Sequence, residues 1–197
     1  MPRSGSTLLF NILREILSLK YGQNLSFGWI HDLIKLPSGR AYLIKTHTLG
    51  PIIRIRSGAF FYTFRDIRTA LVSSARRFES KPSIDLVDKH IKEYKIAQRY
   101  ATLLIRYEDL IDFPEDTILA ISKELSIQTN ASEIWAHVNE LESPKDSTKY
   151  SKTTLLHPNH KTGTGNDDWR LFLESDLICQ ISEKYGWWLR ECGYPEE

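Results

Sequence analysis

The residues best placed to do chemistry come first, in a loop at positions 2–7 with the sequence PRSGST. An apolar segment of helical period follows at positions 8–19, so the loop is predicted to open a helix. The first N–H groups of a helix have no partner within the helix and therefore favour an anion. Hydroxyl side chains, a glycine and an arginine add donors, close backbone approach and a permanent cation. The residues predicted to bind a phosphate or sulfate are Arg3, Ser4, Gly5, Ser6 and Thr7. The alternative is an ordinary capped helix.

Further polar residues follow three short apolar runs that are predicted to be buried strands. The runs at positions 41–44, 59–64 and 102–105 are followed by Lys45 and His47, by Arg65, and by Tyr107. Helical segments separate these runs, and alternating strands and helices predict a parallel sheet with right-handed crossovers. Ligands bind at the carboxyl ends of such strands, so we expect these side chains to meet at one edge of the sheet.

The alternating strands and helices that must position these residues predict an α/β fold. It would have three layers, with a parallel central sheet flanked by helices in a P-loop-like arrangement. We expect one domain over residues 1–197. Asp66 is predicted to cap a helix over 67–78, Pro114 to start another, and Asn130 to cap a third. Positions 23–39 are expected to hold a short helix before a turn. Long helices are predicted over 83–101 and 175–191.

A loop of this type usually follows a buried strand, but only Met1 precedes it here. The first strand of the sheet is therefore expected to be missing or truncated. Two explanations stay open: the sheet lacks that strand, or the natural protein begins further upstream.

A long polar stretch at positions 142–168 has no apolar period, which is typical of a functional loop or a disordered one. Its basic, glycine-bearing part at 157–165 favours a lid over an anionic ligand. The acceptor side of a site would be built from this stretch and from residues 23–36 and 76–92, which contain no recognisable specificity code.

Composition narrows the classes of partner. A net charge of +1 provides no general attraction to nucleic acid or to a membrane surface. No apolar run reaches the roughly 18 residues of a membrane span. Only two cysteines are present, which favours a reduced, cytoplasmic protein. No cluster of His, Cys or Asp has the spacing of metal ligands, so no metal is expected. Oligomeric state is not predicted.

Four separated stretches resemble the sulfotransferases that use 3′-phosphoadenosine 5′-phosphosulfate (PAPS). The loop at 2–7 is similar to that family's 5′-phosphosulfate loop, and Lys45-Thr46-His47 is similar to its K-[ST]-H segment. Arg65-Asp66 with Ser73 matches its R-[DN]-x(6)-S pattern. Tyr107-Glu108-Asp109-Leu110 matches its Y-E-D-[LM] signature, and Lys161, Thr162 and Gly163 ahead of Trp169 are loosely similar to the segment that closes over the donor.

The resemblance implies roles for these residues. Arg3, Ser4, Gly5, Ser6 and Thr7 would bind the phosphosulfate, Arg65 and Ser73 the 3′-phosphate, and Tyr107 would lie near the adenine, with Lys161, Thr162 and Gly163 closing over the donor. The catalytic residues would be His47 as general base, with Lys45 and Arg3 stabilising the transferring sulfonate. This sequence departs from many cytosolic members at Arg3, where they have lysine, and at Leu8, where they have tryptophan.

The function implied is transfer of a sulfuryl group from PAPS to a hydroxyl on a small molecule or a glycan, without a metal. Two alternatives stay open. One is a non-catalytic nucleotide-binding or scaffold protein. The other, less favoured, is a P-loop kinase, which needs a lysine after the loop glycine, whereas Gly5 is followed by Ser6.

Overall fold

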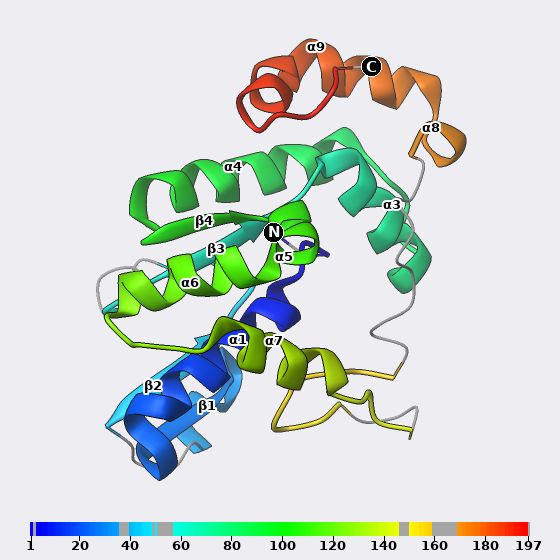
Figure 1. The fold of residues 1–197 in the computed structure, drawn as a ribbon. Helices are drawn as coiled ribbons and strands as arrows, with labels where there is room; N and C mark the ends of the chain where they lie inside the picture. The colour runs from blue at the N-terminus through cyan, green and yellow to red at the C-terminus, as the bar shows by residue number, and fades with distance from the viewer. Residues whose placement is uncertain are drawn as a thin grey trace.

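A computed structural model of the chain describes residues 1, 3–35, 40–48, 50, 57–145, 150–158 and 169–196. Helices and short parallel strands alternate along it (Figure 1). The α-helices are α1 (Ser6–Tyr21), α3 (Ile67–Phe78), α4 (Ile84–Tyr100), α5 (Tyr107–Asp112), α6 (Pro114–Leu125), α7 (Ala131–Glu140), α8 (Trp169–Phe172) and α9 (Ser175–Glu191). The strands are β1 (Leu25–Trp29), β2 (Ala41–Lys45), β3 (Phe61–Phe64) and β4 (Leu103–Arg106), with 3₁₀ turns η1 (Gly22–Asn24) and η2 (Ile30–Lys35) around β1.

The strands form two separate parallel pairs within the described residues, which corrects the expectation of one central sheet. In the first pair β1 lies beside β2, with Leu25 opposite Ala41 and Trp29 opposite Lys45. In the second pair β3 lies beside β4, with Phe61 opposite Leu103. Small parallel sheets flanked by helices therefore make up this α/β fold.

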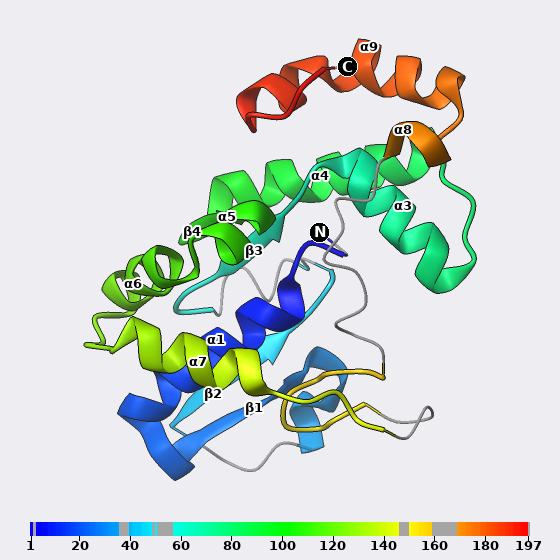
Figure 2. The same cartoon turned by 45° about the vertical axis from the view of Figure 1, so that its right-hand side comes forward.

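Two apolar cores lie on opposite faces of the β3–β4 pair. Tyr62 and Phe64 of β3 pack into the first core with α3, α4 and α9, whereas Ile105 of β4 packs into the second with α1, α6 and α7. Parallel strands that are buried on both faces contribute side chains to both sides in this way. In both views α4 and α9 lie beyond one face of the pair, while α1, α6 and α7 lie beyond the other (Figures 1 and 2).

Helix α1 connects the two strand pairs. It starts beside β3 and continues along β1 and β2, and it contacts all three strands. Its buried side chains Leu9, Ile12 and Ile16 recur at helical spacing, as the sequence predicts. The start of α1 is therefore held between the carboxyl end of β2 and β3.

Several local predictions are confirmed. Asp66 caps α3, because its carboxylate accepts a hydrogen bond from the backbone N–H of Arg68. Asn130 caps α7 through the N–H of Glu133, and Pro114 is the first residue of α6. The caps were predictable because a cap depends on residues that are adjacent in the sequence.

Three regions differ from the predictions. Residues 25–29 form a strand instead of belonging to a short helix, and only η2 after them is helical. Tyr107 begins a helix of its own, α5. Within the polar stretch at 142–168, Leu155 belongs to the second apolar core, and Leu156 is also buried. The prediction that a strand before the loop is missing stays a prediction. Met1 itself is buried against β3, where its nitrogen donates to the carbonyl of Thr63.

Two features concern membranes and metals. None of the described helices combines the length and the apolar character that crossing a membrane would require. Across the described ranges, no three side chains of His, Cys, Asp or Glu are grouped so that they could hold a metal ion.

Candidate functional site

The loop before α1 turns at Gly5, whose φ of 80° lies in the left-handed region that favours glycine. A Cβ atom at this position would lie 2.8 Å from Cδ2 of Tyr107, so no other residue fits without a shift. No side chain caps the helix within the described structure, so the first N–H groups of α1 keep their capacity to bind an anion.

Ser4 does not offer its hydroxyl to a ligand, contrary to the expectation from the sequence. Its side chain is fully buried, and its Oγ lies 3.0 Å from the carbonyl oxygen and 2.9 Å from Oγ1 of Thr63. It also lies 2.5 Å from the carbonyl oxygen of Met1. The hydroxyl thus fastens the loop to β3, and any contact of Ser4 with an anion would come from its backbone.

Thr7 and Lys45 connect the helix to the end of β2. The Nζ of Lys45 donates a hydrogen bond to Oγ1 of Thr7, and both side chains are buried. The same Nζ lies 4.8 Å from the ring centroid of Trp29, its neighbour on β1. Burial lowers the pKa of Lys45 to about 7. An anion bound at the loop would favour the charged form of this lysine.

His47 lies two residues beyond β2, at the surface beside Trp29. The two ring centroids are 5.2 Å apart. Desolvation by the surrounding protein, and next the charge of Lys45, lower the pKa of His47 below its usual 6.5, although the side chain still reaches solvent. A neutral imidazole at pH 7 can accept a proton, which is the state that a general base requires.

Arg65 lies at the end of β3 with its guanidinium against Tyr107. Its Cζ is 4.3 Å from the centroid of the Tyr107 ring, and the residue is only 7% exposed. Its Nε is buried and has no hydrogen-bond partner among the described residues. A buried charged donor without a partner is costly, and an anionic ligand would satisfy it.

Arg3 joins the loop to α3. Its Nε donates to Oγ of Ser73 at 2.9 Å, across a sequence separation of 70 residues. Gly5 meanwhile packs on Tyr107, and Tyr107 packs on Arg65. The structure therefore brings the loop, the β3–α3 corner and the start of α5 into one continuous cluster.

The predicted lid is described only in part. Lys161, Thr162 and Gly163 lie outside the described residues, so their expected contact with the donor stays a prediction. The preceding segment, residues 150–158, is fastened to α1: Asn11 donates to the carbonyl of Thr154, and Arg14 to that of Thr153, each at 2.9 Å. Burial, then Arg77 and Lys45, lower the pKa of His157.

Trp29, Asn11 and Arg14 are residues that sequence reasoning did not single out. Asn11 and Arg14 are buried among the apolar residues of α1. Because buried polar groups are hydrogen-bonded, a polar residue at such a position indicates a specific contact. Trp29 has no such sign, because its position depends on the pairing of β1 with β2.

Comparison with known proteins identifies the fold. No family model matches the sequence, and no curated protein matches it either. A crystal structure described as mouse sulfotransferase SULT7A1 complexed with PAP superposes on the chain with a TM-score of 0.65. The match covers 96% of this chain and 81% of the mouse chain, at 14% sequence identity. Identity this low speaks for the fold alone. This chain therefore shares its fold with a sulfotransferase.

Proposed function

We propose that the protein transfers a sulfuryl group from PAPS to a hydroxyl acceptor. The observation that carries this proposal is the buried Arg65, whose Nε has no partner among the described residues and whose guanidinium lies beside Tyr107 and close to the anion loop. A nucleotide with anions at both its 5′ and 3′ positions fits such a pair of sites. The chain also shares its fold with a protein that was crystallised with PAP, which is adenosine 3′,5′-bisphosphate, and this supports a nucleotide of that kind as the ligand.

Two groups of residues would bind the donor. The N–H groups at the start of α1, with Arg3, Ser6 and Thr7, would hold the 5′-phosphosulfate, and Gly5 and the backbone of Ser4 would let it approach. Arg65 and Ser73 would hold the 3′-phosphate, with Tyr107 beside the adenine. The hydrogen bond between Arg3 and Ser73 supports one continuous site for the two anions.

The chemical step would exchange one bond to sulfur for another. The acceptor oxygen forms a bond to sulfur while the bond from sulfur to the phosphate oxygen breaks, and adenosine 3′,5′-bisphosphate leaves. His47 takes the proton of the acceptor hydroxyl. Lys45 and Arg3 stabilise the negative charge on the sulfonate and leaving oxygens, as fixed cations do in phosphoryl transfer.

The acceptor would be a small molecule or a glycan that reaches His47 from the surface. We further propose that residues 1–197 act as one domain, which is supported by the contacts of α1 with both strand pairs. A kinase is disfavoured because Ser6 follows Gly5 where a P-loop has lysine.

Nucleotide binding, followed by turnover, tests the proposal. Calorimetry should show binding of adenosine 3′,5′-bisphosphate and much weaker binding of ATP, and labelled PAPS should transfer its label to at least one member of a panel of hydroxyl compounds. Binding without transfer to any acceptor would favour the non-catalytic alternative. Preference for ATP would contradict the proposal altogether.

A further inference from the structure

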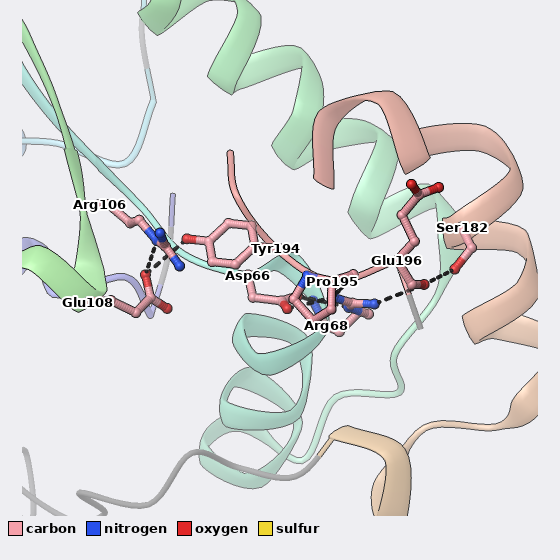
Figure 3. Close-up of polar contacts among 8 residues, drawn as sticks. All are labelled: Asp66, Arg68, Arg106, Glu108, Ser182, Tyr194, Pro195 and Glu196. Carbon is pink, nitrogen blue, oxygen red and sulfur yellow. Dashed lines mark hydrogen bonds and ion pairs between the residues drawn. The ribbon is translucent and has the colours of Figure 1, made fainter. Parts of the chain in front are cut away.

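The end of the described chain makes an unusual set of contacts behind the Arg65 cluster. Residues 194–196, which we call the C-terminal strap, leave α9 and cross to the start of α3 and to the junction of β4 with α5 (Figure 3). Nothing in the proposed chemistry uses these residues. Their contacts are nevertheless specific, and two of the residues involved, Tyr194 and Arg68, are buried.

The first attachment point is Arg68, which is fully buried. Its Nε and Nη2 donate to the two carboxylate oxygens of Asp66 at 3.0 and 2.8 Å. Its remaining donors reach the strap, at 2.5 Å to the carbonyl of Pro195 and 3.3 Å to that of Glu196. A buried guanidinium needs all of these partners, so Arg68 ties the strap to Asp66, the residue next to Arg65.

The second attachment point is Glu108, in the first turn of α5. The hydroxyl of the buried Tyr194 donates to Oε2 of Glu108 at 3.0 Å. Arg106 donates to the same oxygen at 3.1 Å, and its guanidinium lies 4.6 Å from the ring centroid of Tyr194. These contacts hold the residues on either side of Tyr107.

The strap is itself fixed to α9. Ser182 donates to the carbonyl of Glu196 at 2.9 Å, and Arg190 forms an ion pair with the Glu196 carboxylate at 2.6 Å. Figure 3 shows Arg106 and Glu108 beside Tyr194 at one end of the strap, and Arg68 beside Pro195 and Glu196 at the other. The strap therefore joins one rigid helix to two corners of the molecule.

These two corners carry the two halves of the Arg65–Tyr107 contact. Arg65 precedes Asp66 at the β3–α3 corner, and Tyr107 lies between Arg106 and Glu108 at the β4–α5 junction. β3 and β4 pair directly, with Phe64 opposite Arg106, and the strap holds the two corners just beyond this pairing, where the guanidinium meets the ring. A ligand phosphate bound by Arg65 would be sensitive to the distance between that guanidinium and the ring.

We infer that Tyr194, Pro195 and Glu196 are positioning residues, which hold Arg65 and Tyr107 in the geometry that recognises a 3′-phosphate. This inference rests on the proposed function. None of the three residues belongs to the proposed donor site, and they act through Arg68 and Asp66 on one side and through Glu108 on the other.

Selective loss of 3′-phosphate recognition tests the inference. In a chain that lacks residues 195–197, affinity for adenosine 3′,5′-bisphosphate should fall at least tenfold, whereas affinity for AMP should change less than twofold. Tyr194→Phe, which removes only the hydroxyl, should cause a smaller loss of about threefold and provides the same test if the shortened chain fails to fold. Lys184→Gln is the matched control, because it breaks a contact of α9 with Asp88 and leaves the strap intact.

Calorimetry measures these affinities, and each of its outcomes decides a different question. Equal losses for both nucleotides would show a general effect on stability and overturn the inference, as would unchanged affinities in both strap variants. If the intact protein binds adenosine 3′,5′-bisphosphate no better than AMP, the proposed function fails first and the inference with it.

Discussion

The guanidinium carbon of Arg65 lies 4.3 Å from the ring centroid of Tyr107, and both residues follow directly from parallel neighbouring strands. Such a contact orients a cation whose own donors are only partly used. The guanidinium is thus oriented before any ligand binds. Its contribution to 3′-phosphate recognition can be measured by comparing nucleotides with and without that phosphate.

Arg65→Ala should weaken binding of adenosine 3′,5′-bisphosphate by about 2 kcal/mol, or roughly 30-fold, because a charge-assisted hydrogen bond to a buried group is lost. Binding of AMP, which lacks the 3′-phosphate, should change less than about threefold. Calorimetry with the two nucleotides measures both quantities. Parallel losses would remove Arg65 from the 3′-phosphate site.

Gly5→Ala should abolish most donor binding, because the new Cβ would both strain a φ of 80° and press on Tyr107. Gly22→Ala is a matched control: Gly22 also has a positive φ, of 49°, but a Cβ there meets nothing within 4 Å. The control should lose about 1–3 kcal/mol of folding stability, because its ψ of −127° places Gly22 in a sparsely populated backbone region. Thermal unfolding and nucleotide binding, measured together, separate the two effects. Normal binding by the Gly5 variant would argue against close packing of the loop.

His47→Ala should keep donor binding and lose about 10²–10⁴-fold in turnover, the usual contribution of a general base. His31→Ala serves as the control, because His31 is also exposed and stacks on the same Trp29 ring but has no role in the proposed chemistry. Rates measured with any accepted acceptor make the comparison. A variant that turns over normally would exclude His47 as the base.

Turnover should also show a particular pH profile. The pKa of His47 is lowered to about 4, so the imidazole is already neutral at pH 6 and the rate should not depend on its titration between about pH 6 and 8. As the pH falls, the rate at saturating donor should decline only toward about pH 4, where the base becomes protonated. A decline as the pH rises above neutrality would report Lys45 instead. A steep loss of rate as the pH falls through the usual histidine pKa would contradict this assignment.

Donor affinity should decrease as the pH rises above neutrality, because burial lowers the pKa of Lys45 to about 7 and only the protonated lysine attracts an anion. Binding of the anionic donor is coupled to protonation of Lys45 in this pH range, so a higher pH opposes binding. Lys45→Gln should bind more weakly at pH 6 and show a flatter profile between about pH 6 and 9. Identical slopes in the two proteins would assign the pH dependence to another group.

Local sequence rules were sufficient for some of the structure. Asp66 and Asn130 mark helix starts through hydrogen bonds to residues two or three positions away, and Pro114 does so as the first residue of its helix. All three predictions are confirmed. The order of apolar runs also anticipated which residues follow the strands. Arg65 and Tyr107 do lie together, as expected for neighbouring parallel strands.

Contacts between distant segments could not be predicted in this way. Residues 25–29 are short and contain a glycine, and they become a strand only because residues 41–45 lie beside them. The orientation of Ser4 toward Thr63 follows from the position of β3, about 60 residues away in the sequence. Nothing in the sequence indicates that Arg68 is buried, since its partners on the strap lie more than a hundred residues further along.

The β3–α3 corner has a consequence for how the chain folds. It is joined to Met1 through Thr63 and to Pro195 through Arg68, contacts that span 62 and 127 residues. Closing such long loops is slow, and the second contact needs a segment that is made more than a hundred residues after Arg68. Both apolar cores could begin to assemble during synthesis, whereas the corner that carries Arg65 would be completed only after the strap is released from the ribosome.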